Sequence, residues 1–275
     1  MGSNFKHISY SYLHLLACPY ASFLRYSAAV KGPTTEYIAL GNALHHALEV
    51  AHVETGVFNF LRAISLFQTE FMRIIEDEQV AVGWPKLKKM ESEGIEMLEK
   101  YDAQVTSGIL SASPMALEVK FSLPFMGTEI VGRIDKVEHI EGVGYVITDF
   151  KSGATKPTAW DLRHNVQLST YAWACLELYG EMPAKVVWHH LRTGELLESP
   201  RTDQDINDVK LMVTNAIKMD EMGIRHRIFH EKVCGFCDYR GAMCEDRELE
   251  QYALDTVTSG GKMLPQIYVK PPRWA

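Results

Sequence analysis

Residues 132–135 read Gly-Arg-Ile-Asp and residues 147–151 read Ile-Thr-Asp-Phe-Lys, the most informative segments of the chain. Asp135 lies in one predicted strand, and Asp149 lies at the end of the next. A short turn between these strands would bring the two carboxylates together, where a divalent cation such as Mg²⁺ relieves their repulsion. Lys151 follows Asp149 by two residues and projects from the same face of its strand. A lysine there can orient or deprotonate a metal-bound water, or stabilise charge on a phosphate.

Strand-like and helical patterns alternate around these segments. Apolar residues alternate with other residues from 117 to 123, and similar short runs follow, so we predict strands over 117–123, 128–138, 145–150 and 185–191. The first three strands have tight links, which favours an antiparallel meander. Helices are predicted over 158–179 and 203–223.

The N-terminal part has apolar residues at helical spacing. The predicted helices cover residues 9–29, 37–53, 58–81 and 87–105. No internal repeat or low-complexity linker divides the chain. We therefore expect one domain with a helical N-terminal part.

The composition is typical of a globular protein, with 47% apolar and 23% charged residues in a chain of 275. The formal net charge of −7 counts against binding nucleic acid through a globally basic surface, but it allows binding in a local groove. No apolar run approaches the roughly 20 residues that span a bilayer. No basic and then apolar leader is present either. We expect no membrane association, and a cytoplasmic location in a bacterial, archaeal or phage-infected cell.

The five cysteines are further candidates for chemistry: Cys18, Cys175, Cys234, Cys237 and Cys244. Their odd number, without a secretion signal, favours metal binding over disulfides. Cys234 and Cys237 form a C-x-x-C and Cys244 follows, so a tetrahedral site needs one more ligand. Cys175 lies in an apolar helix, where buried structural thiols are common, and Cys18 lies at a helix end. Four thiolates suit either Zn²⁺ or an iron–sulfur cluster, and spacing alone does not separate them.

The strand-borne Asp…Asp-x-Lys arrangement resembles the PD-(D/E)xK nuclease superfamily, whose third motif is (D/E)-x-K. Alone, D-x-K is common by chance, and its ordinary interpretation is two surface aspartates and a solvated lysine. Further features stand in the order found in the RecB-like members. Residues 41–45, Gly-Asn-Ala-Leu-His, match their G-x-x-x-H helix, and Glu118 starts the first strand. Gln167 and Tyr171, on one helix face, match Q-x-x-x-Y. A lone helical histidine such as His45 is otherwise usually structural.

This resemblance implies a restriction-endonuclease-like α/β core, in which helices flank a central mixed sheet. The single domain, 1–275, would consist of a helical part at about 1–112, a nuclease core at about 113–225 and a cysteine segment at about 226–250 joined to Cys18.

The resemblance also implies a divalent metal, Mg²⁺ or Mn²⁺, held by His45, Asp135, Asp149 and the backbone carbonyl of Phe150. In the family pattern, Lys151 aligns the attacking water or takes its proton. Glu118 binds a second ion or holds the ligands in place. Gln167 and Tyr171 are expected to face the DNA. The implied catalytic set is Asp135, Asp149, Lys151, Glu118, Gln167 and Tyr171.

The two ends of the chain resemble the iron–sulfur RecB-like nucleases, which include AddB-type subunits and CRISPR-associated RecB-like exonucleases. Their S-x-S-x-L-x-x-x-x-C-P-x-x-x-F pattern corresponds to residues 9–23, and C-x-x-C-x(6)-C corresponds to residues 234–244. The resemblance implies a structural [4Fe–4S] cluster bound by Cys18, Cys234, Cys237 and Cys244. Ligation would close a very long loop and hold both ends of the chain together.

Together these features predict a metal-dependent DNA exonuclease that acts on single-stranded DNA or DNA ends, in recombination, repair, or phage or CRISPR DNA processing. The alternative is a non-catalytic, metal-stapled nucleic-acid-binding module, which the acidic charge disfavours. A nucleobase deaminase would need H-x-E and P-C-x-x-C, but Val233 precedes Cys234. Residues 261–263, Gly-Lys-Met, do not complete a P-loop, so a helicase or recombination partner would be a separate protein.

Overall fold

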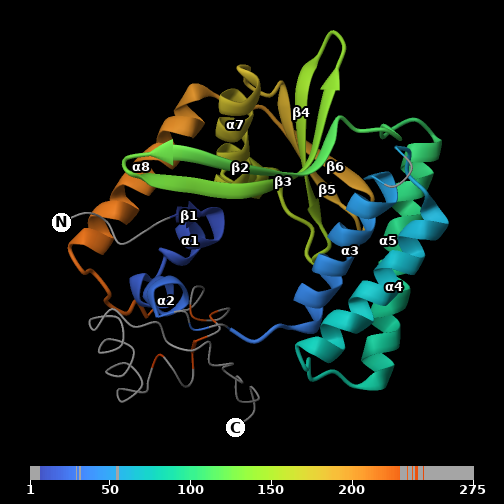
Figure 1. The fold of residues 1–275 in the computed structure, drawn as a ribbon, viewed down its shortest axis with the longest axis horizontal. Coiled ribbons are helices and arrows are strands. Elements are labelled where there is room, and N and C mark those ends of the chain that lie inside the picture. The colour runs from blue at the N-terminus through green and yellow to red at the C-terminus, as the bar shows by residue number, and fades with distance from the viewer. Residues whose placement is uncertain are drawn as a thin grey trace. The chain divides into compact units, whose positions relative to one another are not determined.

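The computed structural model describes residues 7–28, 30, 32–53, 56–229, 234, 237, 239, 240 and 244 (Figure 1). Most of the predicted cysteine segment, 226–250, lies outside the described residues, although its three cysteines lie within them. The chain divides into two compact units. Unit 1 takes in residues 1–33, 124–131 and 210–275, and unit 2 takes in residues 34–123 and 132–209. The single-domain organisation stays a prediction.

The helices follow the predicted apolar spacing with two differences. Their bounds are α1 (Tyr10–Leu15), α2 (Pro19–Ser22), the π-helical η1 (Phe23–Ser27), α3 (Glu36–Val53), α4 (Phe60–Asp77), α5 (Trp84–Thr106), α6 (Ala159–Arg163), α7 (Val166–Tyr179) and α8 (Asp203–Glu221). The predicted helix 9–29 is interrupted, because Cys18 is extended and Pro19 lacks the N–H that would continue the helix. The predicted helix 158–179 is two helices, because the Asn165 side chain accepts from the Leu168 N–H at 2.8 Å and caps a new start. Among the described residues, no helix is both long and apolar enough to cross a membrane.

Most of a mixed sheet belongs to unit 2. Its strands are β2 (Ala116–Phe125), β3 (Thr128–Ile140), β4 (Gly144–Lys151), β5 (Lys185–His190) and β6 (Glu195–Ser199). The order is β3-β4-β5-β6, and β2 pairs with β3. β4 and β5 are parallel, whereas the β3–β4 and β5–β6 pairs are antiparallel. α7 supplies the crossover that a parallel pair requires. The α/β fold with a mixed sheet flanked by helices is therefore confirmed.

Two short strands were not predicted from the sequence. β1 (His7–Ser9) pairs in parallel with the start of β3 within unit 1, and β6 follows β5 after a tight turn. β2 and β3 form the expected hairpin. Its central residues, Met126 and Gly127, have φ of 49° and 78°, the positive values that a type I′ turn requires.

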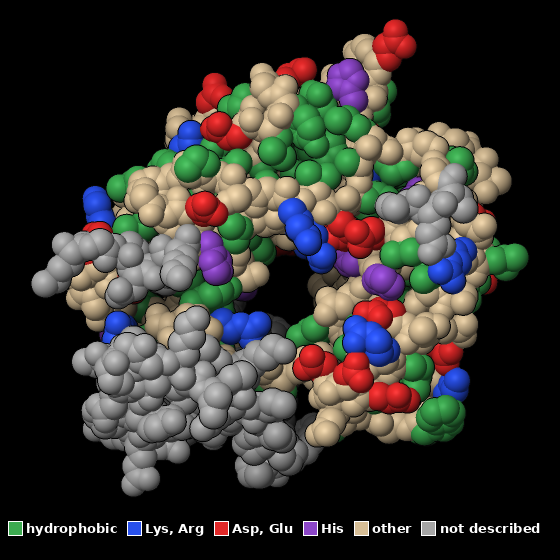
Figure 2. All heavy atoms as spheres, viewed as in Figure 1, with side chains coloured by type: hydrophobic (Ala, Val, Ile, Leu, Met, Phe, Trp, Pro, Cys, Tyr) green, Lys and Arg blue, Asp and Glu red, His purple; other side chains and the backbone are tan. Residues whose placement is uncertain are grey.

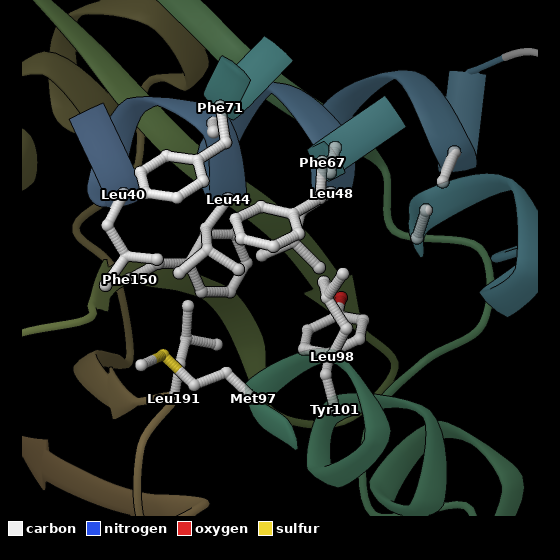
Figure 3. Packing of buried hydrophobic residues seen from close by; sticks show 14 of the residues in the cluster. Leu40, Leu44, Leu48, Phe67, Phe71, Met97, Leu98, Tyr101, Phe150 and Leu191 are labelled. Atoms are coloured by element: carbon white, nitrogen blue, oxygen red, sulfur yellow. The ribbon is translucent and has the colours of Figure 1, made fainter. Parts of the chain in front are cut away.

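The core of unit 2 lies between the helices α3–α5 and one face of the sheet (Figure 3). Leu40, Leu44 and Leu48 repeat along α3 and are at most 1% exposed, so one apolar stripe faces the sheet. The same cluster includes Phe67, Phe71, Met97, Leu98, Tyr101, Phe150 and Leu191. Burying each such side chain contributes about 1.5–3 kcal/mol. Because Phe150 points into this core, its neighbours on β4 point to the opposite face, toward α7.

Candidate active site

Strands β3 and β4 carry the two aspartates across from one another. The antiparallel register pairs Lys136 with Thr148. Continued by one residue, the same register places Asp135 opposite Asp149. There the Phe150 N–H donates to Asp135 Oδ2 at 2.7 Å, so a side-chain carboxylate accepts this hydrogen bond in place of a main-chain carbonyl. Both aspartates are buried, with Asp149 1% exposed and Asp135 6% exposed. The meander predicted from the sequence therefore brings the two carboxylates to one place.

Helix α3 adds His45 to the aspartates. His45 Nδ1 lies 3.4 Å from Glu118 Oε1 and 3.5 Å from Asp135 Oδ1, and Nε2 lies 3.3 Å from the Phe150 carbonyl oxygen. One ligand atom each from His45, Glu118 and Asp135 lie within 4.8 Å of one another, close enough to hold a metal ion. Because Leu44 is locked in the core, the rotation of α3 is fixed, and with it the position of His45.

Glu118 enters this group with a strained backbone. Its φ is 50°, in the left-handed region that non-glycine residues rarely adopt in a strand. The residue is 8% exposed, and its Oε2 pairs with the guanidinium of Arg133. Arg133 is absent from the predicted site residues, although it lies in the Gly-Arg-Ile-Asp segment. Its proximity to Glu118 depends on the register in which β2 pairs with β3, which the sequence pattern does not specify.

Lys151 connects Asp149 to helix α7. Its Nζ lies 2.6 Å from Asp149 Oδ2 and donates to Gln167 Oε1 at 2.9 Å, and Gln167 Nε2 donates to the Tyr171 hydroxyl at 2.9 Å. The lysine also lies over the ring of Trp188, 5.7 Å from its centroid. Asp149 thus enters the site as an ion pair with Lys151, beside the three-residue group of His45, Glu118 and Asp135.

The expectation that Gln167 and Tyr171 face the DNA stays a prediction, and the structure shows that Tyr171 is buried. The tyrosine is 5% exposed, and its ring meets Phe121 edge-on, with centroids 6.1 Å apart. The i,i+4 spacing correctly predicts one shared helix face, but that face packs on the sheet. Gln167 therefore contacts Lys151 from the α7 side, and Tyr171 contacts Gln167.

The crowded carboxylates shift the pKa of the groups among them. Burial lowers the pKa of His45, but Asp135, Glu118 and Asp149 outweigh this effect and raise it to about 9. Burial and the neighbouring Asp149 hold the pKa of Asp135 above its ordinary value, against the opposing effect of His45. The site thus concentrates negative charge that a divalent cation would offset. Imidazole nitrogen with carboxylate oxygens is a donor set that could hold a metal ion.

One face of the helices of unit 2 is of mixed charge. On the face seen in Figure 2, acidic and basic side chains are interspersed over these helices. Many are paired: Arg73 lies 2.7 Å from both Glu70 and Asp77, and Lys88 lies 2.7 Å from Glu91. Phosphate contacts of this unit would therefore depend on individual cations near the site rather than on a broad basic surface.

Three of the predicted cluster cysteines gather in unit 1. Cys18, Cys237 and Cys244 share one apolar cluster, together with Tyr20, Ala21, Phe23, Leu24, Ala28, Val30 and Tyr239. Burial raises the pKa of the Cys244 thiol, Arg227 opposes this shift, and the nearby Cys18 and Cys237 add to it. The Cys237 N–H donates to the Cys234 carbonyl oxygen at 3.4 Å.

Cys175, the other candidate for a fourth thiolate, lies in α7 of unit 2. It is fully buried, and its thiol donates to the Glu181 carbonyl at 3.5 Å. Burial raises its pKa to about 12, which disfavours the thiolate that a metal requires. Of the two candidates, Cys18 is the one that shares a cluster with Cys237 and Cys244.

No curated protein matches the chain. The chain is similar to a solved structure from Eubacterium rectale described as a candidate exonuclease, with 13% identity, a TM-score of 0.54, and coverage of 90% of this chain and 92% of that one. That likeness shows a shared fold. The structure of SSO0001, at 13% identity and a TM-score of 0.34 over 79% of this chain and 92% of that one, is too distant to support an argument. The model of the PD-(D/E)XK nuclease superfamily matches residues 7–245, and the chain belongs to that superfamily.

Proposed function

We propose that this protein is a metal-dependent DNA exonuclease that acts on single-stranded DNA or on DNA ends. Superfamily membership supports a hydrolytic nuclease. The observation that carries the proposal is the convergence of His45, Glu118 and Asp135 beside the ion pair of Asp149 and Lys151. The Eubacterium rectale protein with the same fold is described as a candidate exonuclease, and the proposal extends that activity to this chain.

The metal, Mg²⁺ or Mn²⁺, would be held by His45, Asp135, Asp149 and the Phe150 carbonyl, with Glu118 next to them. The carboxylates of Asp135 and Asp149 are buried, hard and anionic, which fits these ions. When bound, such an ion lowers the pKa of a water and polarises the scissile phosphate. Glu118 Oε1 lies against His45 Nδ1 and orients the imidazole ring.

Lys151 would act at the reacting phosphate. Its Nζ lies between Asp149 and Gln167. From this position it can donate a hydrogen bond to the attacking water or to a phosphate oxygen. Gln167 and Tyr171 are positioning residues in this scheme, because their hydrogen bonds fix Lys151 rather than reach the substrate.

The test uses the purified full chain with Mg²⁺ or Mn²⁺ on end-labelled DNA, single- and double-stranded, linear and circular. We expect nucleotides to be released from linear single strands, circular DNA to resist, and Lys151→Ala to lower the rate by about a hundredfold or more. Lys89→Ala, on the exposed surface of α5, is the matched control. A wild-type rate in Lys151→Ala would contradict the lysine's role. Binding without cleavage would favour the alternative, a non-catalytic nucleic-acid-binding module.

The proposal includes a structural [4Fe–4S] cluster bound by Cys18, Cys234, Cys237 and Cys244. The gathering of Cys18, Cys237 and Cys244 supports it. We expect protein purified without air to absorb visible light and to contain iron and sulfide. Cys18→Ser should lose the iron and melt at a lower temperature, whereas Cys175→Ser should keep its iron. Wild-type protein that holds zinc and no iron would contradict the cluster.

The proposed setting is DNA recombination, repair, or phage or CRISPR DNA processing in the cytoplasm. Residues 1–275 contain no P-loop, and the proposed source of the motor that unwinds duplex DNA is a helicase or recombination partner. The chain alone should then degrade a single-stranded overhang and stop near the duplex. Processive degradation of blunt duplex DNA would contradict the need for such a partner.

A further inference from the structure

The short helix α6 presents an aromatic pair to solvent. Trp160 is 69% exposed, and its ring stacks on that of His164, with centroids 4.4 Å apart and an angle of 27° between the planes. The His164 ring is itself fixed, because Nδ1 lies 2.8 Å from the Trp160 carbonyl oxygen. The pair therefore exposes a flat apolar surface to water, which is unfavourable in free energy.

Helix α6 is held rigidly despite its length. Thr158 and Asp161 form a reciprocal capping box at its start. Leu162 is 2% exposed. Arg201, itself 6% exposed, donates to the Leu162 carbonyl at 2.6 Å and to Ser169 Oγ of α7 at 3.1 Å. A ring on such a support loses little conformational entropy when it binds a partner.

The aromatic pair lies in the segment that joins Lys151 to Gln167. The start of this segment is anchored, since Arg192 Nε donates to the Ser152 carbonyl at 3.3 Å and His190 Nε2 lies 2.9 Å from the Gly153 carbonyl oxygen. Its other end runs directly into α7, whose Gln167 accepts a hydrogen bond from Lys151. Both ends of this segment are thus anchored next to residues of the candidate active site, Lys151 and Gln167.

The cations near α6 are already paired. Arg163 forms an ion pair with Asp205, and Lys156 Nζ lies 2.6 Å from Glu195. These two cations are therefore not free to bind phosphate. The surface instead exposes a preorganised aromatic ring, and the part of DNA that stacks on such a ring is a base.

We propose that Trp160 and His164 form a stacking platform for an unpaired nucleobase of the strand being degraded. This inference rests on the proposed function and deepens it, because it assigns the substrate as unpaired DNA. Bases inside a duplex are already covered on both faces, whereas a single strand or a frayed end exposes base faces that can stack on Trp160.

The test compares two probes with the full chain in EDTA, which prevents metal-dependent cleavage. One is an oligothymidylate of about 15 nucleotides and the other is an abasic strand of the same length and charge. Trp160→Ala should weaken oligothymidylate binding by roughly five- to a hundredfold, the range of one stacked base, and leave abasic binding unchanged. Trp160→Phe should retain most of the affinity, and His164→Ala should lose part of it.

The matched control is Trp84→Ala on α5, where the tryptophan is 63% exposed and Lys88 Nζ lies 4.9 Å from its ring centroid. It should bind both strands as the wild type does. The platform is overturned if the wild type does not prefer oligothymidylate over the abasic strand, or if Trp160→Ala keeps that preference. Loss of binding to both strands would equally overturn it.

These experiments distinguish a failure of the proposed nuclease activity from a failure of the proposed stacking platform. Metal-dependent cleavage that Lys151→Ala abolishes, with unchanged base preference in Trp160→Ala, would remove the platform and leave the nuclease. Trp160-dependent binding of oligothymidylate without any cleavage would remove the nuclease and leave the platform.

Discussion

Burial and the adjacent Asp149 hold the pKa of Asp135 above its ordinary value, so the charged carboxylate destabilises the metal-free fold. A carboxyl group with a raised folded pKa contributes stability in acid, and this contribution is lost as the pH rises through that pKa. Asparagine keeps an acceptor for the Phe150 N–H but carries no charge. We expect Asp135→Asn to be more stable than the wild type in EDTA at mildly alkaline pH, by about 1–2 kcal/mol.

The same variant should lose nuclease activity and the increase in melting temperature that Mg²⁺ gives the wild type. Thermal unfolding with EDTA and with Mg²⁺ measures both effects. Asp77→Asn, at a side chain 61% exposed on α4, should change neither by more than a few tenths of a kcal/mol. A lower melting temperature of Asp135→Asn in EDTA would show that the carboxylate is not a source of strain.

The chemistry of single residues could be predicted where one element carries the relevant spacing. Asp149 and Lys151 share a strand face, so their cooperation follows from sequence alone. The role of Gln167 could not be predicted in the same way, because its contact with Lys151 depends on how α7 packs on β4. The pairing of Arg133 with Glu118 likewise arises only when two strands meet.

At the scale of elements, β2 and β3 approach closely where Gly132 faces Phe121. A Cβ on Gly132 would lie 2.3 Å from Phe121 Cζ, so any side chain there must displace the ring or a strand. Glu118 lies on β2 and Asp135 on β3, so such a shift separates two of the candidate metal ligands. We expect Gly132→Ala to cost about 1–3 kcal/mol of folding free energy and to weaken Mn²⁺ binding severalfold, by denaturant titration and calorimetry.

A compensating change tests the cause of that loss. Phe121→Leu in the Gly132→Ala background should recover part of the stability and part of the Mn²⁺ affinity, because it removes the clashing ring. Gly83→Ala is the control, since a Cβ there would meet no described atom within 4 Å. Equal Mn²⁺ affinity in Gly132→Ala and the wild type would show that the hairpin does not set the spacing of the ligands.

Elements with a long periodic signal could be predicted, and shorter or context-dependent ones could not. The apolar stripe along α3 and the alternation along β2 both specify their elements locally. β1 (His7–Ser9) and β6 (Glu195–Ser199) are too short for such a signal. The parallel pairing of β4 with β5 depends on the crossover through α7, which is a property of the assembled sheet.

At the scale of the whole molecule, the division into two compact units leaves no mark in composition, because the chain crosses between them several times. Unit 2 holds all the residues of the candidate active site, and unit 1 holds the gathered cysteines. The motif order along the chain indicates the chemistry of each unit, but only contacts distant in sequence define which segments belong to which.

The stability of unit 2 should depend on two histidines that connect its layers in the neutral form. His52 of α3 lies 3.0 Å from the Tyr101 hydroxyl of α5, and His189 of β5 stacks on the Tyr101 ring with centroids 5.6 Å apart. Burial lowers the pKa of His52 to about 4, and burial with the nearby Lys136 lowers that of His189 to about 3.

An unfolded histidine takes up its proton near pH 6.5, whereas these two resist protonation until far lower pH. Between these values the unfolded chain binds more protons than the folded one, so stability that is present above pH 6.5 is lost as the pH falls toward 4.

The His189 nitrogens lack a hydrogen-bond partner among the described residues, so His189→Leu removes one titrating group and leaves no other polar group without its partner. We expect this variant to lose stability on acidification less steeply than the wild type, by up to about 1.4 kcal/mol per pH unit. Urea unfolding across this pH range measures the slope. Parallel slopes in the two proteins would mean that His189 is not held neutral, and that the acid sensitivity of the fold has another source.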